Sequence, residues 1–585
     1  MADTFMIQAQ NLSKKFSTSA ASAEVIALDR LNLSVKKRSL TALIGPDGAG
    51  KTTFMRLVCG LMQQDNGSLS VCGLDVKKFP QAVQSLIGYM PQKFGLYEDL
   101  SVLENLTLYA DIHAVDKGLR QQRFTELLSL TGLSPFTKRL AGKLSGGMKQ
   151  KLGLACTLVA MPELILLDEP TVGVDPLSRR ELWQILHTLA KEKSLTVLVN
   201  TAYIEEAEQC DYVYMLHKGR LLASGTPAEL RQFAEGRCYN VQVPKNMPSR
   251  FLQSWLMDDR QLVMDAVSEG SSVRFTVAQK QLPRQLLLQK YLPDAVINPV
   301  ASRLEDSFML LLRQAEAADE VSAVQAPLPA ASPKIAQDRI IEAQKIVRRF
   351  GDFIAVDHTS FYVRKGEIFG LLGPNGAGKS TTFRMLCGLL PVSSGTISVA
   401  GVNMRTARAH ARSYIGYVAQ KFSLYSNLSV EENLCFFGRA YGLERKRLQQ
   451  RIAQVVQEFN LSSCLDMAAG SLPGGYKQRL SMAAALLHEP PILFLDEPTS
   501  GIDPLARRTF WRQITGLAAR GTTVVVTTHF MEEAEYCDRI MIQDQGRLIA
   551  IGTPAAIRQQ GGDSNNMNEA FIHIVEAGRQ KGAAE

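Results

Sequence analysis

The stretch Gly45-Pro-Asp-Gly-Ala-Gly-Lys-Thr-Thr53 recurs later in the chain as Gly373-Pro-Asn-Gly-Ala-Gly-Lys-Ser-Thr381. Each stretch follows an apolar run, Leu40–Ile44 or Ile368–Leu372, so a buried strand leads into a Gly-rich loop and a helix. This is the context of a phosphate-binding P-loop, where backbone N–H groups and the positive helix N-terminus surround phosphates. The sequence therefore predicts two nucleotide sites. The expected phosphate-binding residues are Gly45, Gly48, Gly50, Lys51, Thr52, Thr53, Gly373, Gly376, Gly378, Lys379, Ser380 and Thr381.

The repeat extends far beyond the P-loops. Lys51 and Lys379 are 328 positions apart, and the same spacing relates Trp183 to Trp511. A register held over so many residues indicates two homologous α/β domains. We expect the first domain at residues 1–235 and the second at 335–585.

The region between the two copies has a different composition. Residues 236–314 contain strand-like runs and no phosphate motif, which predicts a small α/β appendage of the first domain. Residues 315–334 are rich in alanine and proline and lack aromatic side chains, which is typical of a solvated linker.

Two acidic residues follow a buried strand in each copy. Asp168 and Glu169 come after Leu164–Leu167, and Asp496 and Glu497 end the equivalent run. Because α/β sheets bind ligands at the carboxyl ends of their strands, these side chains are expected beside the P-loops. We expect Asp168 and Asp496 to hold Mg²⁺ together with the Thr52 and Ser380 hydroxyls, and Glu169 and Glu497 to act as general bases.

Composition excludes several other classes of protein. The chain has 585 residues, 46% hydrophobic and 21% charged, and its longest apolar runs are far shorter than the roughly 18 residues of a membrane span. Its first 30 residues contain no apolar segment typical of a secretory signal. Nine scattered cysteines without a Cys-x-x-Cys pair predict reduced thiols, and a net charge of +8 over this length is weak evidence for nucleic acid.

The stretch Leu144-Ser-Gly-Gly-Met-Lys-Gln150 resembles the signature motif of ABC ATPases and lies between the P-loop and the acidic strand, as in that family. The resemblance implies a RecA-like core with antiparallel β and helical subdomains in each domain, with ATP and Mg²⁺ as ligands. It also implies that Gln92 and Gln420 contact the metal, that Asp175 and Asp503 form D-loops, and that His529 is the switch histidine. Phe16 and Phe350 match the position of an adenine-stacking aromatic, with ordinary packing as the alternative.

Two further stretches of sequence indicate which branch of the ABC ATPases the chain resembles. The stretches Gln92–Asn105 and Gln420–Asn433 are similar to the drug-exporter branch, and the whole arrangement is similar to the YbhF-type tandem ATPases. These fused pairs of nucleotide-binding domains serve two separate ABC-2-type permeases. The resemblance implies export of drugs or other amphipathic compounds, peripheral attachment to the cytoplasmic face of the inner membrane, and no nucleic-acid partner.

Aromatic residues in these stretches have an implied role as well. In ABC transporters a coupling helix of the permease enters the cleft beside the Q-loop glutamine. Phe94, Tyr97, Phe422 and Tyr425 would line that cleft, with packing inside the helical subdomain as the alternative.

ABC domains pair head-to-tail, so each site combines the P-loop of one domain with the signature of the other. Pairing within this chain makes the two sites unequal. The first site faces Pro473, Gly474 and Gly475, where proline replaces the family serine, and has Ala202 at its switch position. The second site combines Lys379, Glu497 and His529 with Ser145, Gly146 and Gly147, and every consensus group is present.

Both departures remove hydrogen-bonding groups from the first site, which predicts that the second site carries most of the hydrolysis. Two alternatives remain. Proline is common at the start of a helix and could simply begin one there, and alanine at position 202 could be neutral drift.

Two other functions fit a tandem ABC chain. A tandem ABC protein acting on ribosomes usually has a long, charged, helical connector, whereas this connector is strand-containing and then rich in alanine and proline. A tandem importer ATPase of the sugar type is the third hypothesis. Neighbouring genes for two membrane proteins with about six spans each would favour the exporter.

Overall fold

The computed structural model describes residues 4–17, 24–244, 247–259, 262–282, 295–317, 338–406, 411–500, 502–562 and 566–584. The linker expected at residues 315–334 lies outside them from residue 318 onward, and its first three residues end a helix. The predicted domain boundaries therefore stay predictions.

The centre of each copy is a six-stranded sheet with the P-loop strand inside it. The two orders are β10-β9-β3-β8-β7-β6 and β24-β23-β17-β22-β21-β20, so the topology of the first copy is repeated in the second. Strands β3 (Leu40–Ile44) and β17 (Ile368–Leu372) are buried along their whole length between parallel neighbours. The other strands are β6 (Ile87–Met90), β7 (Leu164–Asp168), β8 (Thr196–Asn200), β9 (Tyr212–His217), β10 (Arg220–Gly225), β20 (Ile415–Val418), β21 (Ile492–Asp496), β22 (Thr523–Thr527), β23 (Arg539–Asp544) and β24 (Arg547–Gly552).

An antiparallel four-stranded sheet packs on each core. Apolar residues alternate with polar ones along these strands, and the apolar face joins the cluster around the P-loop helix α1 (Lys51–Val58) or α12 (Lys379–Leu386). The strands are β1 (Phe5–Ser17), β2 (Glu24–Lys36), β4 (Asn66–Val71) and β5 (Leu74–Asp75) in the first copy, and β15 (Arg339–Phe350), β16 (Phe353–Arg364), β18 (Ser394–Val399) and β19 (Val402–Asn403) in the second.

Each copy also has a helical subdomain that begins with the same cap. Ser101 and Glu104 form a capping box at the start of one helix, and Ser429 and Glu432 repeat it in the second copy. The helices of this subdomain are α3 (Val102–Ile112), α4 (Lys117–Leu130) and α5 (Gly146–Leu158) in the first copy, and α14 (Val430–Ala440), α15 (Arg445–Glu458) and α16 (Gly474–Ala485) in the second. The expected fold of two ABC-type domains is confirmed.

The remaining helices of the two copies flank the sheets or follow the acidic strands. They are α2 (Pro80–Leu86), α6 (Pro176–Lys191), α7 (Ile204–Ala207) and α8 (Pro227–Arg231) in the first copy, and α17 (Pro504–Ala519), α18 (Met531–Ala534), α19 (Pro554–Gln560) and α20 (Met567–Ala584) in the second.

The appendage contains an antiparallel sheet of order β12-β13-β11-β14. Helix α9 covers it, and Trp255 and Phe275 share the small core between them. The last helix, α11, buries Leu304 and Phe308 in the core of the first copy, as α20 buries Phe571 in the second. The bounds are β11 (Cys238–Gln242), α9 (Ser249–Asp258), β12 (Val263–Glu269), β13 (Ser272–Val277), β14 (Ile297–Pro299) and α11 (Leu304–Ala317).

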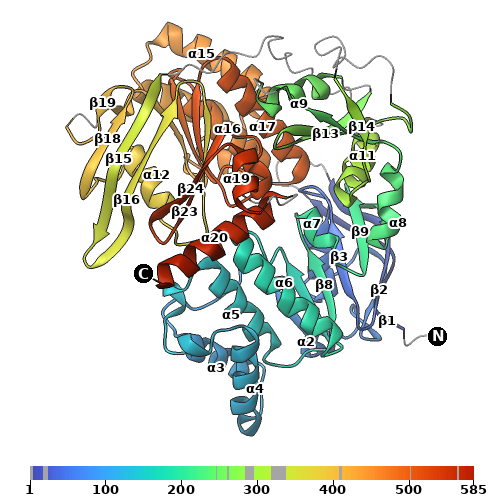
Figure 1. The fold of residues 1–585 in the computed structure, drawn as a ribbon. Helices are drawn as coiled ribbons and strands as arrows, with labels where there is room; N and C mark the ends of the chain where they lie inside the picture. Colours follow the sequence, from blue (N-terminus) through green and yellow to red (C-terminus); the bar gives the residue numbers. More distant parts are fainter. Residues whose placement is uncertain are drawn as a thin grey trace.

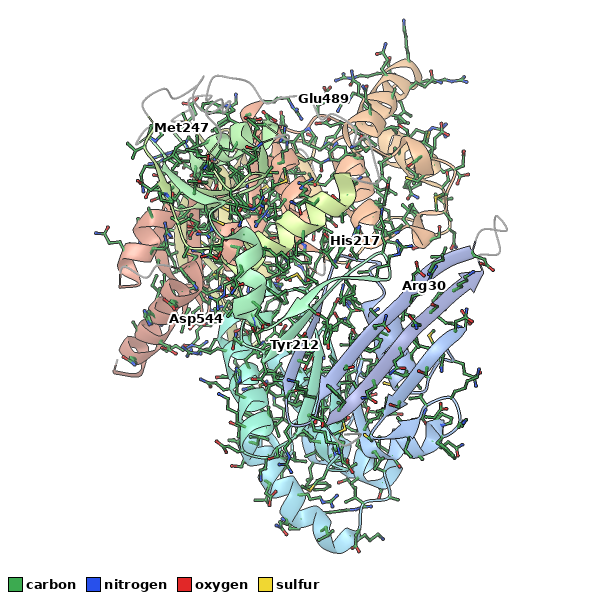
Figure 2. The ribbon with its side chains drawn as sticks, turned by 90° about the vertical axis from the view of Figure 1, so that its right-hand side faces the viewer. Arg30, Tyr212, His217, Met247, Glu489 and Asp544 are labelled. Atoms are coloured by element: carbon green, nitrogen blue, oxygen red, sulfur yellow. The ribbon has the colours of Figure 1, made fainter. Side chains whose placement is uncertain are left out.

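The two copies and the appendage pack together. Helix α20 of the second copy lies beside α6 of the first, and Arg180 pairs with Glu576 at 2.5 Å between them (Figure 1). The appendage, marked by Met247, lies next to the second copy, whereas Arg30 marks the antiparallel sheet of the first copy (Figure 2). In the part of the chain that the structure describes, no helix is long and apolar enough to cross a bilayer.

Candidate functional site

Both P-loop lysines lie inside their own loops. Lys51 Nζ donates to the carbonyls of Gly45 at 2.7 Å and Pro46 at 2.9 Å, and Lys379 makes the equivalent bonds at 2.6 and 2.9 Å. Burial lowers the pKa of both lysines, although nearby carboxylates oppose this. Because an ammonium group has three protons, one remains for a phosphate oxygen.

The glycine before each lysine has no room for a side chain. Gly50 has φ 96°, and a Cβ there would lie 2.3 Å from the carbonyl oxygen of Ala27. Gly378 repeats this with φ 98° and a distance of 2.4 Å to the Ala355 oxygen. Only glycine fits this left-handed close approach, and the backbone then turns its N–H groups into the loop. Both loops therefore have the cradle that a polyphosphate requires.

Oxygen ligands gather at the end of strand β7. Thr52 Oγ1 donates to Asp168 Oδ1 at 3.2 Å, and the Asn200 amide also donates to Asp168. In the second copy Thr527 Oγ1 donates to Asp496 Oδ1 at 2.6 Å. A hydroxyl beside a carboxylate is a donor set that suits Mg²⁺, so Thr52 and Asp168 fit the expected ion. The hydroxyl on Asp496 is that of Thr527, the counterpart of Asn200 and not the expected Ser380, so the role of Ser380 stays a prediction.

The two glutamates that follow are in a strained conformation. Glu169 has φ 52° and Glu497 has φ 46°, which is the left-handed region that non-glycine residues seldom adopt. Gln92 Nε2 donates to Glu169 Oε2 at 2.6 Å, and Gln420 makes the same bond to Glu497 at 2.6 Å. The expected general bases and the Q-loop glutamines are therefore brought together in both copies.

The charge environments of these glutamates differ. Burial raises the pKa of Glu169 to about 6, and the nearby carboxylates add to this. Burial acts on Glu497 in the same direction, but His529 outweighs it together with Lys379 and Gln420, and the pKa of Glu497 falls below its ordinary value. His529 Nδ1 lies 3.2 Å from Glu497 Oε2, whereas Ala202 occupies the equivalent position in the first copy. The missing histidine thus changes the acidity of the base.

The P-loops face the opposite copy. The backbone N–H of Asp47 donates to Asp503 Oδ2 at 3.3 Å, and that of Asn375 donates to Asp175 Oδ2 at 3.5 Å. The Asn375 amide also lies 3.2 Å from the position that a Cβ on Gly146 would take. Each P-loop therefore meets the D-loop of the other copy and lies next to its signature, so the two copies are arranged head-to-tail within one chain.

The two signature helices begin differently. Ser145 caps α5, and its Oγ accepts from the Met148 N–H at 3.3 Å, which leaves the hydroxyl proton free to donate. Pro473 occupies the cap of α16 without a side-chain hydrogen bond, and Gly474 and Gly475 form the first turn. The helix still forms with proline, so what differs is the hydroxyl group and the backbone N–H.

The comparisons with known proteins agree with this geometry. A family described as "ABC transporter" matches residues 28–172 and 356–500, one match in each copy. The "Probable multidrug ABC transporter ATP-binding protein YbhF" of Escherichia coli is 48% identical over 94% of this chain and 95% of its own length. The chain belongs to the ATP-binding proteins of ABC transporters.

Shorter relatives match one copy of this ABC ATPase. The "Nod factor export ATP-binding protein I" of Burkholderia lata is 44% identical over 37% of the chain and 72% of its own length. The "Linearmycin resistance ATP-binding protein LnrL" of Bacillus subtilis is 42% identical over 40% of the chain and 78% of its own length. The expected ATP binding and ATPase activity are those of this family.

The aromatic side chains expected to contact adenine or the permease differ in their exposure to solvent. Phe16 and Phe350 are exposed at the ends of β1 and β15, each within cation–π distance of a basic side chain. Tyr97 and Tyr425 are also exposed, whereas Phe94 stacks on Tyr109 with ring centroids 5.2 Å apart. The roles of these residues remain predictions.

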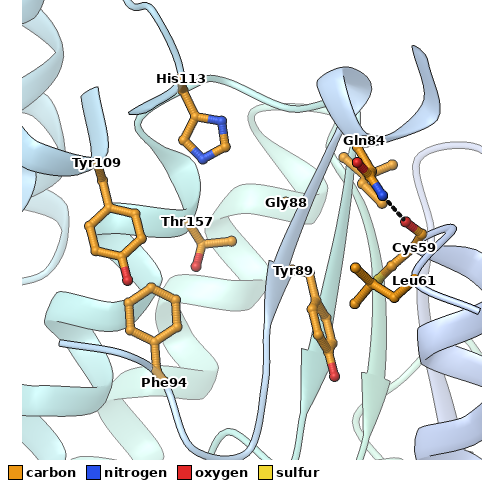
Figure 3. Close-up of a pocket in the computed structure, with 10 residues that line it drawn as sticks. Cys59, Leu61, Gln84, Gly88, Tyr89, Phe94, Tyr109, His113 and Thr157 are labelled. Atoms are coloured by element: carbon orange, nitrogen blue, oxygen red, sulfur yellow. Dashed lines mark hydrogen bonds between the residues drawn. The ribbon is translucent and has the colours of Figure 1, made fainter. Parts of the chain in front are cut away.

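A hollow lies next to the Q-loop of the first copy (Figure 3). It has a volume of about 180 Å³, with Phe94 and Tyr109 on one side and Tyr89 and Cys59 on the other. The Gln84 amide donates to the Cys59 carbonyl at 3.1 Å on its wall. Phe94 is thus both a packed residue and part of a concave surface.

Sequence reasoning missed two features of the site. Asp47 and Asn375 differ at the P-loop position that faces the other copy, although both residues are within the motif that defines the fold. Tyr203 and Phe530 follow the switch positions, and their rings meet between the copies with centroids 5.4 Å apart. The first difference could be read from the repeat, but the second contact depends on how the copies pack.

Proposed function

We propose that this ABC ATPase powers an ABC-2-type exporter of drugs or other amphipathic compounds, with two permease chains as partners. The observation that supports this best is the single-chain pair of crossed sites, together with 48% identity over nearly the whole chain to a tandem protein named as a probable multidrug transporter subunit. Two further relatives are named for export and for resistance. These names describe multidrug transport, export and resistance, so the exporter is preferred over the two alternatives.

In the proposed reaction ATP binds both crossed sites, and the second hydrolyses it. Lys379 binds a phosphate oxygen, Ser145 donates to the terminal phosphate, and Glu497 accepts a proton from the attacking water. Ser380, Gln420 and Asp496 would hold Mg²⁺, which would supply charge neutralisation of the phosphates when bound. Gly373, Gly376 and Gly378 supply the backbone cradle, and Phe350 stacks on adenine.

The first site binds ATP in the same way and hydrolyses it slowly. Lys51, Thr52, Gln92 and Asp168 are in place there, with Phe16 as the adenine platform. Ala202 stands in place of the switch histidine there, and the facing signature has Pro473 in place of the serine hydroxyl, so two hydrogen-bonding groups are missing around the terminal phosphate. Bound ATP would then mainly hold the two copies together.

Replacing the P-loop lysine tests the assignment of the second site. Lys379→Ala should abolish most steady-state ATP turnover, since one charged hydrogen bond contributes about 1.5–3 kcal/mol. Lys51→Ala is the matched control and should have a smaller effect on hydrolysis. Full activity of Lys379→Ala would show that the second site is not the hydrolytic one.

Co-expression tests the partner. The chain should sediment with membranes when its permeases are present, and its turnover should rise because the permeases align the two copies. Equal sedimentation with membranes that contain no permease would point to a direct lipid anchor and against the proposed attachment at the cytoplasmic face.

A further inference from the structure

The loops that follow the switch positions have the same construction in both copies. Tyr203 is the N-cap of α7, and its N–H donates to Thr201 Oγ1 at 3.0 Å. Phe530 is the N-cap of α18, and its N–H donates to Thr528 Oγ1 at 2.9 Å. Each aromatic side chain is therefore fixed by the same short turn, and the head-to-tail arrangement brings the two turns face to face.

A row of three rings connects the two copies. The Tyr203 and Phe530 rings have centroids 5.4 Å apart with planes tilted by 33°, and the Phe530 ring lies 4.4 Å from the His529 imidazole. Tyr203 is 7% exposed, Phe530 is 4% exposed and His529 is 1% exposed. Tyr203 of the first copy is thus one ring away from the switch histidine of the second.

An arginine lies against each of the two aromatic rings. The Arg179 guanidinium is 4.1 Å from the Tyr203 centroid, and that of Arg507 is 4.5 Å from the Phe530 centroid. Arg507 Nη1 also donates to Glu532 Oε2 at 3.2 Å, which holds the arginine in place. Because Phe530 lies between Arg507, His529 and Tyr203, a change on the Tyr203 side leaves space into which it can shift.

The histidine depends on this packing for its orientation. Its Nδ1 lies 3.2 Å from Glu497 Oε2 as a close charge contact, and neither ring nitrogen has a hydrogen-bond partner among the described residues. One polar contact does not fix the plane of a ring, so the neighbouring ring contributes the rest. We propose that Tyr203 is a positioning residue for His529, so that the copy without a switch histidine orients the histidine of the other copy. This inference rests on the proposed role of His529 in the second site.

The surroundings of the Tyr203 hydroxyl indicate whether this residue acts through packing of its ring or through a hydrogen bond. It is buried and has no hydrogen-bond partner among the described residues. Burial also raises the pKa of Tyr203, so the phenol stays neutral. The ring is therefore the part that acts on Phe530, and phenylalanine should replace it.

Steady-state ATPase kinetics of the full chain test the proposal. Tyr203→Ala and Tyr203→Leu should lower kcat about tenfold and change KM less than about twofold, because a displaced group costs less than the about 10²–10³ lost with a missing donor. Tyr203→Phe should keep most of kcat. Leucine preserves bulk, so its thermal unfolding midpoint shows whether folding or positioning is affected. Tyr441→Ala removes a similar contact, to His488 at 4.0 Å and away from the sites, and should keep kcat.

A double-mutant cycle with His529→Ala separates the two hypotheses. If Tyr203 acts through His529, adding Tyr203→Leu to His529→Ala causes no further loss of kcat. Additive losses, or a rise in KM without a fall in kcat, would overturn the positioning role. A fall in kcat for His529→Ala with none for Tyr203→Leu would overturn it as well. If His529→Ala itself keeps full kcat, the proposed second site is wrong instead.

Discussion

A single difference within the P-loops makes the two sites electrostatically unequal. Asp47 is at the tip of the first loop, next to Asp503 of the second copy. Burial and the carboxylate of Asp503 raise the pKa of Asp47. Asn375 has the same position in the second loop but is neutral, and its amide donates to the Gly173 carbonyl at 3.1 Å. A polyphosphate in the first site therefore meets one additional negative charge.

Asp47→Asn should tighten ATP binding at the first site. Removing a charge a few ångströms from a phosphate is worth about 1 kcal/mol in a solvated site, or about fivefold in affinity. An ATP titration in a Lys379→Ala background isolates the first site.

The mirror substitution is the control for this prediction. Asn375→Asp, measured in a Lys51→Ala background, should weaken binding at the second site by a similar factor. If the two substitutions leave both affinities unchanged, the P-loop tip does not contribute to the asymmetry.

At the scale of elements, the appendage connects the first copy to the second. Buried Arg250 on α9 pairs with Asp538, and Arg508 on α17 pairs with Glu305 at 2.5 Å. The N–H of Gly270, after β12, donates to Glu535 Oε2 at 2.5 Å. Breaking a buried ion pair typically costs about 3–5 kcal/mol, so these contacts hold the appendage on the second copy.

Glu535 should make the stability of this contact depend on pH. Burial raises its pKa to about 7 even though Arg558 opposes it, so the folded state binds this proton more tightly than the unfolded state. The stabilisation is present at acidic pH and is lost as pH rises from about 4.5 to about 7. Between pH 5 and pH 8 the midpoint of thermal unfolding should therefore fall less in Glu535→Gln than in the unchanged chain. The difference between the two falls should be about 1–3 °C.

An exposed glutamate provides the comparison for Glu535. Glu126 on α4 accepts from the Gln122 amide at 3.1 Å at the surface, and Glu126→Gln should leave the pH profile of unfolding unchanged. Glutamine at position 535 still accepts from the Gly270 N–H. The same profile for Glu535→Gln and the unchanged chain would show that this carboxyl titrates normally in the folded protein.

At the scale of the whole molecule, the head-to-tail pairing of the two copies puts both departures from the family consensus into one site. Pro473 is in the second copy and Ala202 in the first, yet the head-to-tail arrangement brings both segments to the P-loop region of the first copy. Leu505 packs on the core of the first copy and Leu177 on that of the second, so this crossing is part of the packed structure. The consensus groups gather in the other site for the same reason.

The two general-base substitutions should therefore have unequal effects. Glu497→Gln keeps the shape of the side chain but removes its basicity, and should lower steady-state ATPase activity by about 10²–10⁴. Glu169→Gln should lower it much less. Pro473→Ser combined with Ala202→His should raise turnover at the first site. Equal losses from the two glutamine variants would show that the sites are not separable, and a larger loss from Glu169→Gln would refute the assignment.

The fold of the two domains could be predicted from short local patterns, and the same patterns name the residues proposed for the two sites. A P-loop needs glycines at fixed spacing because the backbone itself binds phosphate, so Gly50 and Gly378 are recognisable in the chain. An apolar run ending in Asp168 and Glu169 indicates a buried strand because few other structures bury every side chain. These constraints act within about ten residues, which is why a linear sequence shows them.

Contacts between surfaces were decided only by the tertiary structure. Nothing in the sequence indicates that the rings of Tyr203 and Phe530 meet. The ion pair between Arg250 and Asp538 is equally invisible there, because the chain contains many arginines and aspartates that could pair. The acidity of Glu169 and Glu497 also depends on what lies nearby after folding, since the two residues follow nearly identical strands. Packing, burial and charge interactions are summed over groups far apart in the chain, and that sum exists only once the two copies have come together.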